Sequence, residues 1–391
     1  MCVILFLFHA HLEIYCFNMK LRPYLPALWL AALPYGPTIS SIFFVLALMQ
    51  TISTINWSYV SAQLIKPWFI VLIMLCIYTL LSLSWSPEYN HDALSNIKKV
   101  WRFLLIPILM QGFVTNKQQN TAINGFIIGM LLTVLLSILK QVLHVPWHND
   151  DDAGHIFYNH INTGFFCVFA AFCSINSFFT KSRYKNLYLA SFFILSAEVF
   201  FINSGRAAYI LYMAFLVTFI GLQATSKLRW LYLGLILMGL LMLLKFSAVF
   251  QTRINDCLQD FDALQYGMQS TSIGYRLQFY HFATILFKKH LVLGNGPGSF
   301  YYYFKLYNPV PDWSGPPNTH SQYLLILVEE GLIGFGLWLL FFHNVWKKID
   351  ITGKYLIFLL MINSFSDAIL YSAPGQLLLA ILSLSLVRGK K

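Results

Sequence analysis

The sequence predicts an all-α polytopic membrane protein, that is, a bundle of helices that cross a bilayer many times. Of its 391 residues, 58% are hydrophobic and only 10% are charged, whereas a soluble domain carries about 25% charged residues. The mean hydropathy is +0.63. Apolar segments of about 17–25 residues, the length that spans a bilayer, recur along the chain. We therefore relate the net charge of +11 to membrane topology and expect no nucleic-acid partner.

Hydropathy predicts about twelve spans. They are expected near residues 25–33, 38–52, 66–85, 100–114, 122–143, 162–179, 186–203, 206–223, 228–245, 322–345, 353–370 and 374–387. More than half of the 26 Lys and Arg fall in short loops on one side of these spans. The positive-inside rule makes that side cytoplasmic, together with the N-terminus, and the acid-rich loops external.

Residues 1–18 do not fit this plan. They contain neither a basic n-region nor a small-residue cleavage site, so they make a poor signal peptide. The following MKLRPYLPALWL reads as a natural start at Met19. We expect residues 1–18 to be an incidental extension of one membrane domain over 1–391. The six cysteines show no zinc or redox spacing.

The largest polar segment is the predicted external loop 246–320, whose length of about 75 residues usually indicates structure or function. Within it, GYRLQFYHFATILFKKH (274–290) has apolar residues at helical spacing and predicts an amphipathic helix at the membrane surface. GNGPGSF (294–300) predicts a sharp turn, because it lacks the features of a phosphate loop. Arg276 is expected in the first helical turn, where it could bind a phosphate or meet lipid headgroups.

Arg206 lies in INSGRAAYI, at the external junction of two predicted spans. This position opposes the positive-inside bias, and an arginine near hydrocarbon is costly unless it faces a cavity or an anion. Gly205 beside it permits a close approach of backbone or ligand. Two interpretations stay open, an anion-binding arginine and one that snorkels to the interface.

The stretch PPNTHSQYLLILVEEGLIG (316–334) places polar residues at the mouth of an apolar run. If it is helical from His320 on, His320, Tyr323 and Glu330 share one face, with Glu330 about 15 Å along the axis. That is too far to orient the imidazole, so we expect Glu329 and Glu330 to be structural. His320 lies where a neutral imidazole could take a proton from a substrate hydroxyl. An imidazole satisfied by loop carbonyls is the alternative.

NSFSDAILY places Asp367 inside the eleventh predicted span, on a face with Ser364 and Tyr371. An ionisable residue within a span is a functional candidate, and Arg206 or Arg276 could be its partner.

The remaining polar residues give weaker signals. HVPWHNDDDAGHIFYNH (144–160) has four histidines and three aspartates, but consecutive acids are more typical of a solvated loop, so we expect no metal. His160, which begins the next span, could line the same cavity. Lys98 and Arg102 flank a span at the external side and could meet anionic lipid or pyrophosphate.

The succession of SGR, GYR, GNGPGSF, NTHSQYL with EEGLIG, and SFSDAILY resembles the O-antigen ligase/polymerase superfamily. The resemblance covers the architecture from about residue 20 to 387, with its specific motifs in 203–334. It implies a multi-pass glycosyltransferase of the bacterial inner membrane, with a large periplasmic loop containing amphipathic helices and an active site facing the periplasm. The short loops favour the lipopolysaccharide O-antigen ligase type.

The resemblance also implies an undecaprenyl diphosphate-linked glycan donor, a lipid A–core acceptor, surrounding membrane lipids, and neither cofactor nor metal. At the matching positions, Arg206 and Arg276 hold the diphosphate, and His320 deprotonates the acceptor hydroxyl. Further substrate-binding candidates rest on looser motifs: Asp367, Asn318, Tyr323, Arg102 and Lys98.

Two alternatives stay open. An O-antigen polymerase of the same superfamily would use the same donor and differ in its acceptor. A transporter of lipid-linked oligosaccharides would use arginines to line a path, but alternating access predicts internal repeats, and the sequence shows none.

Overall fold

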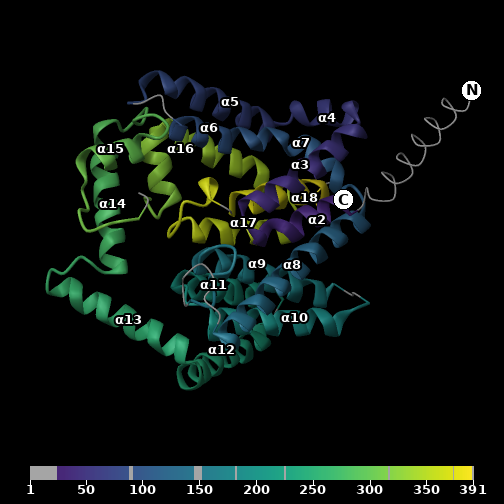
Figure 1. Ribbon diagram of the computed structural model, residues 1–391. Coiled ribbons are helices and arrows are strands. Elements are labelled where there is room, and N and C mark those ends of the chain that lie inside the picture. The colour runs from purple at the N-terminus through teal and green to yellow at the C-terminus, as the bar shows by residue number, and fades with distance from the viewer. Residues whose placement is uncertain are drawn as a thin grey trace, which may run out of the picture.

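The computed structural model describes residues 24–87, 91–144, 152–180, 183–223, 226–315, 318–372 and 374–389. Residues 1–18, with the expected extension, lie outside these ranges. Within them the chain forms helices and their connections, without strands (Figure 1), which confirms the all-α prediction.

The principal helices follow one another along the chain as α2 (Leu25–Ala32), α3 (Pro37–Ser53), α4 (Trp57–Leu64), α5 (Pro67–Leu81), α6 (His91–Trp101), α7 (Ile106–Leu109), α8 (Asn116–Leu143), α9 (His160–Phe179), α10 (Lys185–Ala197), α11 (Arg206–Gln223), α12 (Ser226–Phe246), α13 (Ala248–Gln265), α14 (Ser272–Lys289), α15 (Ser299–Tyr307), α16 (Gln322–Trp346), α17 (Ile351–Asn363) and α18 (Pro374–Arg388). In Figure 1, α13 leads away from α12 at the bottom of the view, and α14 rises beside the bundle toward α15.

Among the described residues, five helices are long and apolar enough to cross a membrane: Pro67–Trp85, Asn116–Leu143, His160–Phe179, Lys185–Ile202 and Gln322–Trp346. Two bent pairs raise the number to seven if each is one span: α3 with α4, at 108°, and Ile236–Phe246 with α13, at 92°. Four shorter apolar helices lie at further predicted spans. A multi-pass membrane protein is therefore confirmed, whereas the count of twelve and the sidedness stay predictions.

The predicted spans 100–114 and 353–370 are not continuous helices in the structure. Over 100–114, the end of α6 is followed by three short pieces, η3 (Arg102–Leu105), α7 and η4 (Met110–Phe113). α17 ends at Asn363, so the expected span to residue 370 is too long, and Asp367 lies in the loop that follows. The expected helical face shared by Asp367, Ser364 and Tyr371 is therefore wrong.

Capping side chains fix the residues at which α14 and α16 begin. The Thr271 hydroxyl accepts a hydrogen bond from the Gly274 N–H at 3.1 Å and caps α14. Arg276 is thus in the second turn, not the first as predicted. Ser321 caps α16 in the same way, through the Leu324 N–H at 3.4 Å. His320 precedes this cap and lies outside the helix, so the predicted stripe from His320 to Glu330 is wrong.

α16 is interrupted at Gly331, where φ is 64° and ψ is −164°. The chain around the GNGPGSF turn fills the interruption, because Leu332 and Ile333 donate their N–H groups to the carbonyls of Leu291 and Val292, at 2.9 and 3.2 Å. In the other direction, Asn295 and Gly296 donate to carbonyls of α16 at 2.8 and 2.9 Å. The turn and the EEGLIG sequence therefore form one backbone joint.

Both glutamates beside Gly331 support this joint. The Glu329 carboxylate accepts hydrogen bonds from the Asn96 amide of α6 at 3.1 Å and from the Gly298 N–H at 3.0 Å. Glu330 accepts one from the Trp338 indole at 3.1 Å. Both are 2% exposed. The prediction that they are structural is confirmed.

The segment 246–320 contributes to a second hydrophobic core. Phe279, Phe282 and Leu286 of α14 pack with Phe300 and Phe304 of α15 and with residues of α16. This small core is separate from the main one, which fills the centre of the bundle. α14 is thereby held against α15 and against α16, the helix that follows His320.

Candidate functional site

The NTHSQ segment forms a tight turn that fixes the backbone of His320. His320 has φ of 47°, a left-handed conformation uncommon for residues other than glycine. Its N–H donates to the Asn318 side-chain oxygen at 3.0 Å, and the Thr319 hydroxyl donates to the Ser321 carbonyl at 2.8 Å. The Tyr280 hydroxyl of α14 lies 3.1 Å from the His320 carbonyl. The turn is thus held from within and from α14.

The His320 imidazole lies between aromatic rings. It stacks on Phe279 with centroids 5.5 Å apart, and it meets Trp313 edge-on at 6.3 Å. Burial and the positive charge of Arg276 lower the pKa of His320 to about 4. The imidazole is therefore neutral near pH 7 and can accept a proton.

Arg276 supplies the positive charge of this site. Its guanidinium acts electrostatically on His320, Asp367 and Tyr280. In the described ranges, which omit residues 316 and 317, it makes no hydrogen bond or ion pair. A guanidinium has five N–H donors in a fork that fits phosphate oxygens. No group of the described residues occupies these donors.

Asp367 joins the same cluster from the loop after α17. It accepts hydrogen bonds from the Ala368 N–H at 2.8 Å and from the Asn318 side chain. Burial raises the pKa of Asp367, and these bonds and the charge of Arg276 offset part of that rise. Of the two arginines predicted as its partner, Arg276 is the one that acts on it.

The other residues predicted to bind substrate lie in different surroundings. Arg102 donates to the Leu370 carbonyl at 2.7 Å, and Gln322 accepts from the Leu370 N–H at 2.8 Å, so both hold the loop that contains Asp367. The Tyr323 hydroxyl donates to the Met361 carbonyl at 2.8 Å. Lys98 is exposed in the last turn of α6. Sequence reasoning missed Gln322 and Tyr280, which support the site through backbone contacts that no motif reveals.

Arg206 lies apart from this cluster, as the first residue of α11. Its Nη1 is 2.8 Å from Oδ2 of Asp260 on α13. No hydrogen bond or ion pair joins it to His320, Arg276 or Asp367 within the described chain. α13 packs against α14, so it connects the surroundings of the two arginines.

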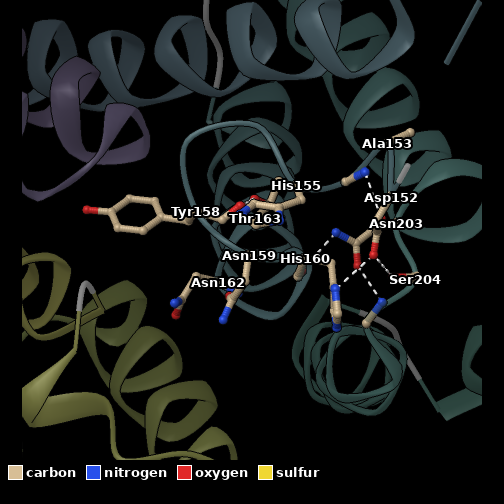
Figure 2. Close-up of polar contacts among 12 residues, drawn as sticks. Asp152, Ala153, His155, Tyr158, Asn159, His160, Asn162, Thr163, Asn203 and Ser204 are labelled. Carbon is tan, nitrogen blue, oxygen red and sulfur yellow. Dashed lines mark hydrogen bonds and ion pairs between the residues drawn. The ribbon is translucent and has the colours of Figure 1, made fainter. Parts of the chain in front are cut away.

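A polar network fixes the junction before Arg206 (Figure 2). The Asn203 side chain donates to the His160 carbonyl and accepts from the Gly205 N–H, both at 2.8 Å. Its backbone carbonyl accepts from the Tyr209 hydroxyl at 2.9 Å. Glycine suits this position, because a Cβ at Gly205 would lie 2.8 Å from the Asn203 side-chain oxygen and would displace it.

Asp152 is the anion of this network. Its Oδ2 lies 2.8 Å from Nδ1 of His160 and accepts a short hydrogen bond from Ser204, while Oδ1 accepts from the Gly154 N–H at 3.0 Å (Figure 2). Burial would raise the pKa of Asp152, but the hydrogen bonds from His160, Ser204 and Gly154 prevail and lower it to about 2. The consecutive aspartates favour a solvated loop by sequence, so this structural role was missed.

The described residues include no group of three His, Cys, Asp or Glu side chains that could hold a metal ion. Part of the His- and Asp-rich loop, residues 145–151, lies outside the described ranges.

The apolar helices define a multi-pass membrane protein, in which an imidazole, a guanidinium and a carboxylate form one polar cluster. Residues 190–339 match the family model described as O-Antigen ligase. This span includes SGR, GYR, GNGPGSF and NTHSQYL with EEGLIG, so the match supports the resemblance to the O-antigen ligase superfamily and a membrane glycosyltransferase of that general type. A search of curated proteins gave no match.

Proposed function

We propose that the protein is an O-antigen ligase. It transfers a polysaccharide from undecaprenyl diphosphate to lipid A–core at the periplasmic face of the inner membrane. The observation that carries the proposal is the cluster of a neutral His320 imidazole, an Arg276 guanidinium that has no ion pair among the described residues, and Asp367.

In this mechanism, the acceptor hydroxyl attacks the anomeric carbon of the donor sugar while the bond to the diphosphate oxygen breaks. His320 takes the hydroxyl proton. Arg276 and Arg206 bind the departing diphosphate, whose charge rises as the bond breaks, and so stabilise the transition state. Asp367 and Asn318 keep the turn and the guanidinium in place. Attack opposite the leaving group inverts the anomeric configuration, and no metal takes part.

The principal test uses purified protein with carrier-linked polysaccharide and lipid A–core in detergent. Wild type should form the glycosylated lipid, which a transporter cannot do without separate compartments. His320→Ala should lose transfer by at least about a hundredfold, as removal of a general base does, while it keeps its thermal stability and its affinity for undecaprenyl diphosphate. Near-normal transfer by His320→Ala would show that His320 is not the general base.

A gene deletion separates the ligase from the polymerase. A strain without a ligase accumulates carrier-linked polymer, whereas a strain without a polymerase still adds a single repeat to its core. The second pattern would replace the proposed function with that of a polymerase.

A further inference from the structure

The two arginines proposed to hold the diphosphate differ in their charge partners. Arg276 makes no ion pair in the described part of the chain. Arg206 is bound to Asp260 at 2.8 Å, and these side chains are 22% and 13% exposed. This degree of burial makes the pair more persistent than an exposed ion pair, because less water screens it.

Asp260 and a diphosphate require the same groups of Arg206. Carboxylate and phosphate oxygens both accept from the guanidinium N–H donors. Two anions held by one guanidinium lie a few ångströms apart and repel each other strongly in a partly buried site. A bound diphosphate must therefore weaken the contact between Arg206 and Asp260 or displace it.

In the proposed reaction, this competition matters most when the lipid diphosphate product is released. In the donor, the terminal phosphate is esterified by the sugar. Transfer breaks the sugar–oxygen bond, leaves the bonding electrons on the diphosphate and gives it an additional ionisable oxygen. The product is more negative than the donor and binds two arginines more tightly, so its release requires another anion for them.

We propose that Asp260 is this anion: its carboxylate recovers the Arg206 guanidinium as the lipid diphosphate leaves, and so sets the rate of product release. Asp260 acts through Arg206 and is therefore a positioning residue. This inference rests on the proposed ligase reaction and extends it to the role of α13, on which no predicted site residue lies.

The test compares three single variants of the full-length protein. Asp260→Asn removes the charge and keeps the shape. It should bind undecaprenyl diphosphate about tenfold more tightly, a change of about 1.4 kcal/mol. Its steady-state kcat should fall while its single-turnover transfer rate stays at the wild-type value. Asp260→Glu, which keeps the charge, should restore the wild-type values.

Asp256→Asn is the matched control. Asp256 lies on the same helix, and its carboxylate pairs with Arg253 at 2.8 Å, so the variant also removes one charge and one ion pair from α13. It should leave binding and turnover unchanged. Equal tightening by Asp256→Asn would mean that the net charge of the helix is responsible, and the specific role of Asp260 would be refuted.

The remaining outcomes separate this inference from the proposed function. Weaker binding by Asp260→Asn would show that Asp260 only orients Arg206, and unchanged binding would show that the pair does not compete with the ligand; either refutes the exchange. If wild type neither binds undecaprenyl diphosphate nor transfers glycan, the proposed function itself fails.

Discussion

Substitution of Gly331 tests whether the stability of the protein depends on the interrupted backbone of α16. Gly331 has positive φ in a region that other residues rarely adopt, and a Cβ there would lie 2.4 Å from both the Gly294 nitrogen and the Val292 carbonyl oxygen. Backbone strain costs about 1–3 kcal/mol and overpacking about the same. Gly331→Ala should therefore lower the stability by about 4 kcal/mol.

Gly336 provides the control, because it lies in the same helix and a Cβ there would have no atom within 4 Å. Gly336→Ala should be neutral or stabilising by up to about 1 kcal/mol, since alanine is the better helix former. The assay is thermal unfolding of both purified variants in the same detergent. If the two melting temperatures agree, the joint does not depend on the backbone of Gly331 and the reasoning is wrong.

Two further predictions concern protons. Burial and the charge of Arg276 lower the pKa of His320 to about 4, so the wild-type kcat/KM should fall only near pH 4. Arg276→Gln should shift this acidic fall to higher pH and should also weaken donor binding. An unshifted pH profile would contradict the coupling between Arg276 and His320. The pKa of Asp152 is lowered from 3.8 to about 2, so the stability it contributes is complete above pH 4 and is lost as pH falls toward 2. By linkage this amounts to about 2 kcal/mol. Asp152→Asn should lose this stability at pH 7, and its melting temperature should fall less steeply than that of wild type below pH 4. If the melting temperatures of variant and wild type depend on pH in the same way, the Asp152 network does not contribute this stability.

The sequence by itself determined the helical membrane class and the segments that bear the site. Continuous apolar runs can satisfy their backbone in a bilayer only as helices, so composition suffices for this conclusion. The apolar spacing of 274–290 predicted α14, and the polar mouth of α16 identified His320. Arg276 was chosen because a guanidinium near a helix N-terminus can bind a phosphate, and Asp367 because an ionisable residue is costly in apolar surroundings; neither criterion needs coordinates.

Only the tertiary structure decided what each charge is paired with. Asp152 and Ser204 are 52 residues apart, and Arg206 and Asp260 are 54 apart. Such pairings depend on how α9, α11 and α13 pack, which local periodicity does not encode. The same holds for the break at Gly331, which is stable because a distant turn supplies the hydrogen bonds that α16 lacks there. Local sequence sets which groups can react, and packing sets which of them meet.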